Sequence, residues 1–484
     1  MFSKAFLKTQ FLPLGYIRNM KKTLLIFAMA VSLAPGCFLT VLAQGITGSP
    51  GEKTGQYIRL MMSKKHIPGL SVAILKEGKI LKMQSYGLAN IETGTAVTSQ
   101  TVYKLGSLSK QFIAAAVMLL EQCGKLHLDS PVSAYLDSLP QTWQSITVQN
   151  LLSHTSGLIR DAPDFDPLKV RTLNEDIQAI YHLPLDFPPG TQWDYSNMNY
   201  YVLAAIIEKV ADTNWVGWIR KHVFEPCGMS QTRAYSISDI IPNRADGYEK
   251  ASAGWKNADI WLALRPSGAF VSSITDLAKW DRMLYSGTLL TASSKKQMWA
   301  ASKLKDGTNA PYGLGWFIDS VNTHLRVHHD GGVPGFRSDF EHYPDYGFSV
   351  IVLTNVGSAN AERIAQNVAG FYMPVLKPLP APALPDTEPG ITTKVKNFIY
   401  TLQHQSAIDT STLAGNIAKD YTKAHTSALA GAIDGKINSI TLIARRERNG
   451  RRTYRYRLDY GYDYIDLVIQ FDPADKIVGY GIDD

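Results

Sequence analysis

Residues 105–125 read LGSLSKQFIAAAVMLLEQCGK, and here a serine and a lysine three positions apart stand at the start of a long apolar run. The run predicts a buried helix, and positions i and i+3 of a helix share one face. The free backbone N–H groups at a helix start favour negative charge. Ser107 therefore suits a nucleophile, and Lys110 can accept its proton or stabilise a neighbouring anion that accepts it.

Ser-x-x-Lys is weak evidence by itself, because the chain repeats it at Ser293/Lys296 and Ser302/Lys305. Only the first pair precedes a strongly apolar helix. A helix-capping serine beside an exposed lysine explains the motif equally well when it is taken alone.

The segments around this helix predict a sheet interrupted by helices. Residues 69–90 (GLSVAILKEGKILKMQSYGLAN) form two apolar runs around Glu77-Gly78, which is typical of a β-hairpin. Later runs predict successive antiparallel strands at residues 313–318, 324–332, 336–344 and 348–355, followed by a helix over about 360–372. Between about residues 129 and 254 the apolar spacing is helical. Strands thus open and close one α+β domain around a helical subdomain.

A second signal is Tyr195-Ser196-Asn197, in the loop FPPGTQWDYSNMNYYVL just before a predicted helix. Tyr195 could act as a general base if nearby cations lowered its pKa from about 10. A shift of about three units needs roughly 4 kcal/mol, which one close ammonium can supply. Asn197 would orient Lys110 and the substrate amide. The alternative is an aromatic packing residue followed by an asparagine turn.

A third signal is VHHDGGVPGF, residues 327–336. Here a predicted strand reaches His329, and Gly331 and Gly332 let the backbone approach a ligand closely. A backbone N–H near Gly332, together with that of Ser107, would supply the paired donors that acyl transfer needs. A glycine-rich turn after a histidine pair is the alternative.

The order and context of these motifs resemble the penicillin-recognising serine hydrolases: AmpC-type β-lactamases, D,D-peptidases, D-aminopeptidases and related esterases. Ser-x-x-Lys, Tyr-x-Asn and His-x-Gly follow in family order. The surrounding stretches YKLGSLSK, ITVQNLLSHTSGL, FPPGTQWDYSNMNY and SGAFVSSITDLAKW are also similar. The resemblance covers about residues 53–372 and implies a β-lactamase-like antiparallel sheet flanked by helices.

The resemblance also implies the roles of the site residues. Ser107 becomes acylated, and Lys110 and Tyr195 transfer the proton. Asn197 positions Lys110 and the substrate amide. The facing strand edge is formed by His329, Gly331 and Gly332. The choice between Lys110 and Tyr195 as principal base stays open.

The strand motif departs from the common family pattern, because Asp330 replaces a hydroxyl residue that helps bind a substrate carboxylate. We expect the acid to repel that carboxylate. Turnover of β-lactams and free D-Ala-D-Ala should then be weak, with a preference for neutral esters or amine-bearing peptides.

The histidines do not predict a metal site. On a strand, His324 and His328 would lie about 13 Å apart, and His154 is expected to brace a helix-ending turn. Neither G-x-S-x-G nor H-E-x-x-H occurs. We therefore expect neither a metal nor a cofactor.

The first residues predict export. From Met20 the chain reads MKKTLLIFAMAVSLAPGCFLTVLAQ, a basic start and an apolar run ending in a small-residue cleavage pattern. We assign residues 1–43 to a signal peptide, which predicts a periplasmic or secreted protein. Membrane attachment through an uncleaved signal or a lipid at Cys37 is the alternative. Five of the cations behind the net charge of +7 lie in this segment, so a mature protein near neutrality argues against a nucleic-acid partner.

The remaining chain divides at a proline-rich stretch. We predict a hydrolase domain over residues 44–376, a stiff linker over 377–390 and a small α+β module over 391–484. Strand-alternating Arg and Tyr in that module favour a solvated face opposite a packed one. Cys123 and Cys227 are expected to be buried thiols, although a disulfide between them stays open.

Together these features predict a secreted serine hydrolase that forms an acyl-enzyme on amide or ester bonds. Its substrates would be small molecules or peptides, such as a peptidoglycan fragment, a D-amino-acid peptide or an ester. The alternative is a penicillin-binding-type sensor or envelope-binding protein with little turnover.

Overall fold

A computed structural model describes residues 46–251, 254–379, 382–404, 409–414, 429–430, 433, 435–448, 450–461 and 463–483. The predicted signal segment, residues 1–43, and Cys37 lie outside these ranges. The chain divides into two units, residues 1–56 and 57–484, and the second unit holds all the sheets described below.

The main sheet has seven strands in the order β3-β2-β1-β12-β11-β10-β9. Their bounds are β1 (Gly69–Lys76), β2 (Lys79–Asn90), β3 (Thr95–Ala96), β9 (Phe317–Val321), β10 (His324–Val333), β11 (Phe336–Tyr343) and β12 (Phe348–Thr354). The first long strand pairs antiparallel with the last, from Leu70 opposite Thr354 to Lys76 opposite Phe348. The first and last long strands therefore pair in the middle of the sheet, whereas the sequence pattern predicted only that strands open and close the domain.

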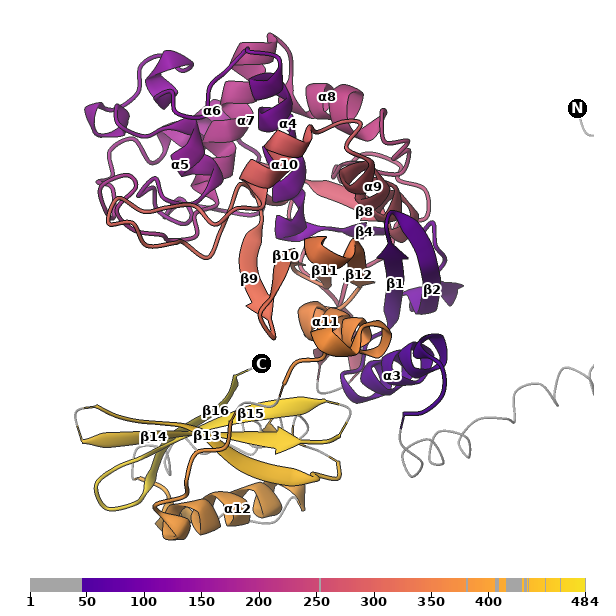
Figure 1. Cartoon of the computed structure of the whole chain (residues 1–484), viewed down its shortest axis with the longest axis vertical. Coiled ribbons are helices and arrows are strands. Elements are labelled where there is room, and N and C mark those ends of the chain that lie inside the picture. Colours follow the sequence, from indigo (N-terminus) through magenta and orange to yellow (C-terminus); the bar gives the residue numbers. More distant parts are fainter. Residues whose placement is uncertain are drawn as a thin grey trace, which may run out of the picture. The chain divides into compact units, whose positions relative to one another are not determined.

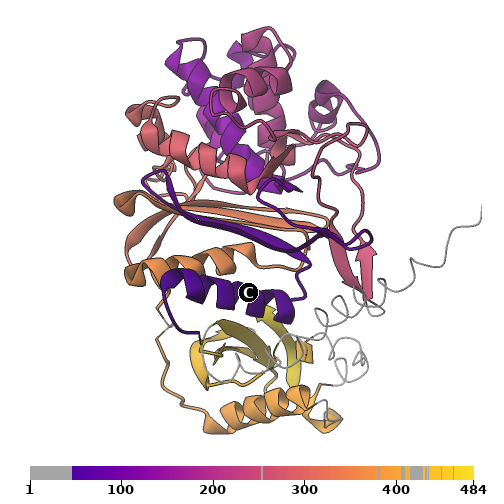
Figure 2. The same cartoon turned by 90° about the vertical axis from the view of Figure 1, so that its right-hand side faces the viewer.

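Helices cover both faces of this sheet. The α-helices described between residues 50 and 372 are α3 (Pro50–Lys64), α4 (Lys110–Gln122), α5 (Val148–Leu152), α6 (Leu173–Gln178), α7 (Met198–Ala211), α8 (Trp215–Ile219), α9 (Ile274–Ser286), α10 (Ala292–Met298) and α11 (Ala361–Tyr372). Figures 1 and 2 show α9 against one face and α11 against the other. The predicted α+β fold, an antiparallel sheet flanked by helices, is confirmed.

Two small sheets connect the helical subdomain to the main sheet. One contains β4 (Val102–Lys104), β5 (Arg233–Ala234) and β8 (Phe270–Ser273), and the other contains β6 (Tyr248–Ala251) and β7 (Gly254–Asn257). Strand β4 leads directly into the Ser107 turn, so its pairing with β8 fixes where that turn begins.

Helix α4 is held by burial on all sides, which is what its uniformly apolar sequence predicts. Every residue from Lys110 to Met118 is buried. The Phe112 ring packs edge-on against Phe224 and Phe270, with centroids 5.2 and 5.9 Å apart. The Trp280 indole N–H donates to the Gln111 side-chain oxygen at 2.6 Å. This packing fixes the position of the residues at the helix start.

Two sequence predictions need correction. The stretch 313–318 is not a strand from its beginning, because the Gly313 N–H donates to the Trp316 carbonyl at 2.8 Å and closes a turn, and β9 starts only at Phe317. Cys123 is exposed and only Cys227 is buried, and both are free thiols. Cys123 directly follows α4, where the chain turns out to solvent.

The carboxy-terminal module has its own core. Strands β13 (Ser439–Arg448), β14 (Arg451–Asp459), β15 (Tyr464–Phe471) and β16 (Ile477–Asp483) form an antiparallel sheet in chain order. Helix α12 (Pro389–Gln403) packs on one face (Figure 1) and begins inside the predicted linker. Tyr454, Tyr456 and Leu458 are buried between the arginines of β14.

Three arginines of this sheet, Arg445, Arg452 and Arg457, have carboxylate partners. Arg457 binds Asp466 through two hydrogen bonds of 2.8 Å, and Arg452 contacts Glu388 at 3.0 Å. These contacts support the structural interpretation of the arginine pattern. Among the helices of the described ranges, none is long and apolar enough to cross a lipid bilayer.

Candidate active site

The Ser107 turn is a short 3₁₀ helix, Gly106–Ser109, that runs into α4 at Lys110. The Lys110 Nζ atom lies 3.2 Å from Ser107 Oγ, so the two side chains share one face as the spacing predicts. Gly106 has a φ of +56°, and a Cβ there would lie 2.7 Å from the backbone nitrogen of Gly332. Glycine at this position therefore lets the Ser107 turn approach strand β10 directly.

The Lys110 amine is completely buried and has only neutral partners. Its Nζ lies 3.0 Å from Asn197 Oδ1 and 2.9 Å from the Ser267 carbonyl oxygen. Burial, reinforced by the positive charge of Arg265, holds the pKa of Lys110 well below its usual range. A neutral amine has two N–H donors and one lone pair. The amide and carbonyl oxygens accept the two N–H groups, and the lone pair is left for the Ser107 hydroxyl.

Tyr195 completes the cluster. Its ring centroid lies 4.7 Å from Lys110 Nζ. Burial raises the pKa of Tyr195 well above 10, and a hydrogen bond with the Ser107 side chain opposes this only in part. The condition for a basic Tyr195, a pKa lowered by nearby cations, is therefore not met, because burial outweighs the lowering by Arg160 and Lys110 is itself driven towards its neutral form. The phenol stays protonated at neutral pH.

His154 supports the Tyr195 loop. It follows the end of α5 with a left-handed φ of +60°, and its buried ring packs on the Tyr195 ring at 4.3 Å between centroids. The Ser196 N–H donates to His154 Nδ1 at 3.2 Å. The prediction that His154 braces a helix-ending turn is confirmed.

Asp161 and Arg265 were not identified from the sequence. Asp161 Oδ1 accepts a hydrogen bond from Asn197 Nδ2 at 3.0 Å, and the same carboxylate forms an ion pair with Arg265. Arg265 immediately precedes the 3₁₀ turn Pro266–Gly268, which presents the Ser267 carbonyl to Lys110. Asp161 thus connects the two elements that bear the acceptors of the lysine.

Strand β10 lies against the Ser107 turn. Strand β9 pairs with β10 only over His324–His328, so within the described residues no strand covers the edge from His329 to Val333. Both ring nitrogens of His329 are engaged, Nε2 with the Tyr312 hydroxyl at 2.8 Å and Nδ1 with the Asp330 carbonyl at 2.6 Å. Its role is therefore to brace the strand from within the core. Tyr312 has no motif that marks it.

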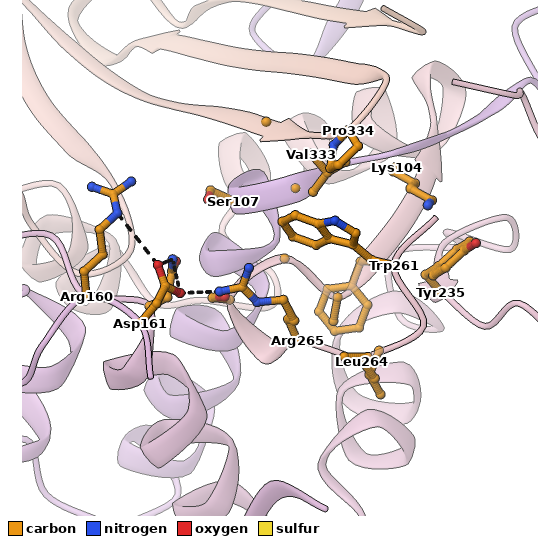
Figure 3. Close-up of a pocket in the computed structure, with 18 of the residues that line it drawn as sticks. Lys104, Ser107, Arg160, Asp161, Tyr235, Trp261, Leu264, Arg265, Val333 and Pro334 are labelled. Atoms are coloured by element: carbon orange, nitrogen blue, oxygen red, sulfur yellow. Dashed lines mark hydrogen bonds and ion pairs between the residues drawn. The ribbon is translucent and has the colours of Figure 1, made fainter. Parts of the chain in front are cut away.

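A cavity of about 250 Å³ opens in front of Ser107 (Figure 3). Its lining includes Gly106, Ser107, Tyr195, Asn197 and Gly332 together with the charged residues Lys104, Arg160, Asp161 and Arg265 and the apolar residues Trp261, Leu264, Val333 and Pro334. Of the predicted strand residues, Gly332 lines this cavity, whereas His329 and Gly331 stand behind it.

Asp330 lines a neighbouring cavity with Arg337 and Ser338, and its side chain is 51% exposed. The carboxylate is therefore not part of the Ser107 cavity wall. Its charge nevertheless acts on the site, where it raises the pKa of both Lys110 and Tyr195, so repulsion of a substrate carboxylate by Asp330 stays an expectation. The other two Ser-x-x-Lys pairs also lie outside the cavity, and Ser293 and Lys296 are exposed on α10. No group of three or more potential metal ligands occurs among the described residues.

The beta-lactamase family model matches residues 55–371, about two thirds of the chain. The chain belongs to the beta-lactamase family. Penicillin-binding protein 4* of Bacillus subtilis is 28% identical over 320 residues, which cover 61% of this chain and 69% of that protein. Membership of this family supports an enzyme of the serine hydrolase type.

Two solved structures share the fold. An octameric penicillin-binding protein homologue from Pyrococcus abyssi aligns with a TM-score of 0.59 and 20% identity, covering 89% of this chain and 99% of that one. D-amino acid amidase from Ochrobactrum anthropi aligns with a TM-score of 0.57 and 22% identity, covering 67% and 98%. The first alignment extends well beyond the segment that matches the family model.

Proposed function

We propose that this beta-lactamase family protein hydrolyses amide or ester bonds through an acyl-enzyme at Ser107. The observation that carries the proposal is the arrangement around Lys110. A buried amine with two neutral acceptors, 3.2 Å from Ser107 Oγ, is set up to accept a proton rather than to bind an anion.

Acylation then follows from the geometry. The Lys110 lone pair takes the proton of Ser107, whose Oγ forms a bond to the substrate carbonyl carbon. Backbone N–H groups at Ser107 and at the Gly332 edge of β10 stabilise the oxyanion. The Tyr195 phenol gives its proton to the leaving nitrogen or oxygen as that bond breaks, and regains a proton from the Lys110 ammonium. Water attacks the ester carbonyl, releases the acid and returns the proton to Ser107.

We propose Lys110 rather than Tyr195 as the base, and the directions of the two pKa shifts support this choice. A phenol whose pKa is raised above 10 is a poor base at neutral pH, and a lysine whose pKa is lowered is a good one. Tyr195 suits the complementary role of general acid.

A fluorophosphonate probe tests the proposal. The expected adduct, located by peptide mass spectrometry, is on Ser107, and Ser107→Ala should lose both labelling and turnover of p-nitrophenyl esters. Ser293→Ala is the matched control, because it removes the exposed serine of another Ser-x-x-Lys pair. Labelling at another residue, or full turnover by Ser107→Ala, would overturn the proposal.

Parallel assays with p-nitrophenyl esters, D-phenylalanine amide and nitrocefin then separate the substrate classes. Sustained turnover supports a hydrolase, whereas one burst equal to the enzyme concentration followed by no turnover supports the sensor alternative.

We also propose that residues 1–43 direct export, so that the enzyme acts on small or peptidic substrates outside the cytoplasm. Amino-terminal sequencing of the mature protein from its native host tests this proposal. A mature terminus close after Ala43 is expected, and a retained Met1 or Met20 would contradict cleavage.

A further inference from the structure

The Ser107 cavity contains a lysine that the acyl-transfer roles do not use. Lys104 ends strand β4, is half-buried and lines the cavity three residues before the nucleophile. Its ammonium lies over the Tyr235 ring at 4.0 Å from the centroid and 5.9 Å from that of Phe336. Among the described residues, no carboxylate lies within ion-pair distance of it.

The other cations of the cavity differ from Lys104 in this respect. Arg265 forms an ion pair with Asp161, and Arg160 lies 3.9 Å from the same carboxylate. Burial, followed by the charge of Arg244, lowers the pKa of Lys104 to about 8. A half-buried cation without a carboxylate partner is stabilised when a ligand anion reaches it.

The two ends of the cavity correspond to the two halves of a substrate. The Arg160 guanidinium lies 5.4 Å from the Tyr195 ring centroid, so this end belongs to the proton donor and to the leaving group. Figure 3 shows Arg160 and Lys104 on opposite sides of Ser107. The Lys104 end therefore faces the acyl group.

The wall between Ser107 and Lys104 is mainly apolar. Trp261, Leu264, Val333 and Pro334 line the cavity, and Figure 3 shows Trp261, Val333 and Pro334 on the Lys104 side of Ser107. An acyl chain that follows this wall would lose water along its methylene groups and bring its far end to the lysine. Asp330, which could repel an anion, lines a different cavity, and its charge contributes to the pKa shifts of Lys110 and Tyr195 but not to that of Lys104.

We propose that Lys104 selects acyl groups in which a short apolar chain ends in a carboxylate. This inference rests on the proposed acyl-enzyme at Ser107 and names the substrate class of that site. It differs from the sequence-based expectation of neutral or amine-bearing substrates, because the unpaired charge in the described wall is positive.

The test compares p-nitrophenyl hydrogen adipate with p-nitrophenyl hexanoate, which have equal chain lengths and differ in the terminal carboxylate. After subtraction of uncatalysed hydrolysis, the wild-type kcat/KM should favour the adipate ester by about tenfold, the usual size of a charge-assisted hydrogen bond. Lys104→Met should bring the ratio close to one, and Lys104→Arg should retain a preference.

Two further variants keep the test specific. Lys104→Glu should reverse the preference towards the p-nitrophenyl ester of 6-aminohexanoic acid. Lys295→Met is the matched control, since Lys295 is also half-buried, with a pKa lowered by burial, and lies 5.9 Å from the Trp299 ring outside this cavity. Its adipate-to-hexanoate ratio should equal that of the wild type.

A wild-type ratio near one overturns the inference without any variant, and so does a preference that survives in folded Lys104→Met. Fluorophosphonate labelling of Ser107 in each variant shows that the fold and nucleophile are intact. Failure of the proposed function looks different, because Ser107→Ala would then hydrolyse both esters.

Discussion

Two buried cations of the hydrolase domain differ in the partners that surround them. Arg326 on β10 is 5% exposed and contacts three carboxylates, with distances of 2.9 Å to Glu341 and Glu362 and 2.8 Å to Asp319. Lys110 is fully buried and contacts an amide oxygen, a carbonyl oxygen and a hydroxyl. Arg326 is held charged by its partners, whereas Lys110 has no counter-ion in hydrogen-bond contact, which is what its proposed role as a base requires.

This difference distinguishes a buried cation that stabilises the fold from a buried amine that the proposed reaction uses. Opposite charges around a buried cation stabilise the fold as long as all of them are present. Neutral acceptors around a buried amine favour its uncharged form, which costs stability but supplies a base at neutral pH. The comparison therefore predicts opposite consequences when each cation is removed.

The largest effect is expected from Lys110→Met. Without a base, kcat/KM for ester hydrolysis should fall by about 10³-fold or more. Unfolding by urea at pH 7 should require at least as much denaturant as for the wild type, because a buried amine is replaced by an apolar chain. A clear loss of stability would show that Lys110 is a structural cation like Arg326.

Arg326→Met should do the reverse. It leaves the completely buried Glu341 without its counter-ion, and the free energy of unfolding should fall by about 3–5 kcal/mol. The matched control is Arg220→Met, which removes an exposed arginine 3.0 Å from Glu225 and should change stability by less than about 1 kcal/mol. Equal losses of unfolding free energy for Arg326→Met and Arg220→Met in urea would show that the buried ion pairs of Arg326 stabilise the fold no more than an exposed pair does.

Asp161→Asn should slow catalysis because it disturbs the position of the groups that hold Lys110. Loss of its ion pair with Arg265 loosens the acceptors of Lys110, and kcat/KM should fall by up to about 10²-fold. The negative charge of Asp161 raises the pKa of Lys110, so its removal should move the acidic limb of the pH–rate profile to lower pH.

Asp164→Asn is the control for this substitution, since it breaks an exposed ion pair with Arg171 nearby in the chain. Its profile should match that of the wild type. An unshifted acidic limb in Asp161→Asn would mean that Asp161 has no electrostatic effect on the base.

The smallest expected effect is on how the free energy of unfolding changes with pH. The folded protein binds one proton fewer at Lys110 than the unfolded chain between the lowered folded pKa and the unfolded value of about 10.4. Wild-type stability should therefore rise with pH relative to Lys110→Met across this window, by up to about 1.4 kcal/mol per pH unit. Urea unfolding at several pH values measures the difference, and parallel curves would contradict a lowered pKa.

The sequence predicted the parts of this site that have local patterns. Ser107 and Lys110 are one helical turn apart, and the strand periodicity placed His329 at the right edge of the sheet. Asp161 and Arg265 have no such pattern, because they come together only when two loops 104 residues apart pack against each other. The direction of the Tyr195 pKa shift could not be predicted for the same reason, since burial depends on tertiary packing.

Asp330 and Lys104 also show that a sequence pattern does not tell which cavity a side chain lines. Replacement of a motif residue suggested that Asp330 faces the substrate, but the strand turns its carboxylate towards another cavity. Lys104 lies in the stretch YKLGSLSK, but the sequence does not show that its side chain lines the Ser107 cavity or that it lacks a carboxylate partner among the described residues.

The most direct measurement is an NMR titration of the Lys110 amine in the folded enzyme, labelled with ¹³Cε-lysine and assigned by comparison with Lys110→Met. The Lys110 resonance should titrate well below 10.4, while exposed lysines titrate close to that value. A midpoint at or above 10.4 would show that the amine is charged at neutral pH and cannot be the base that activates Ser107.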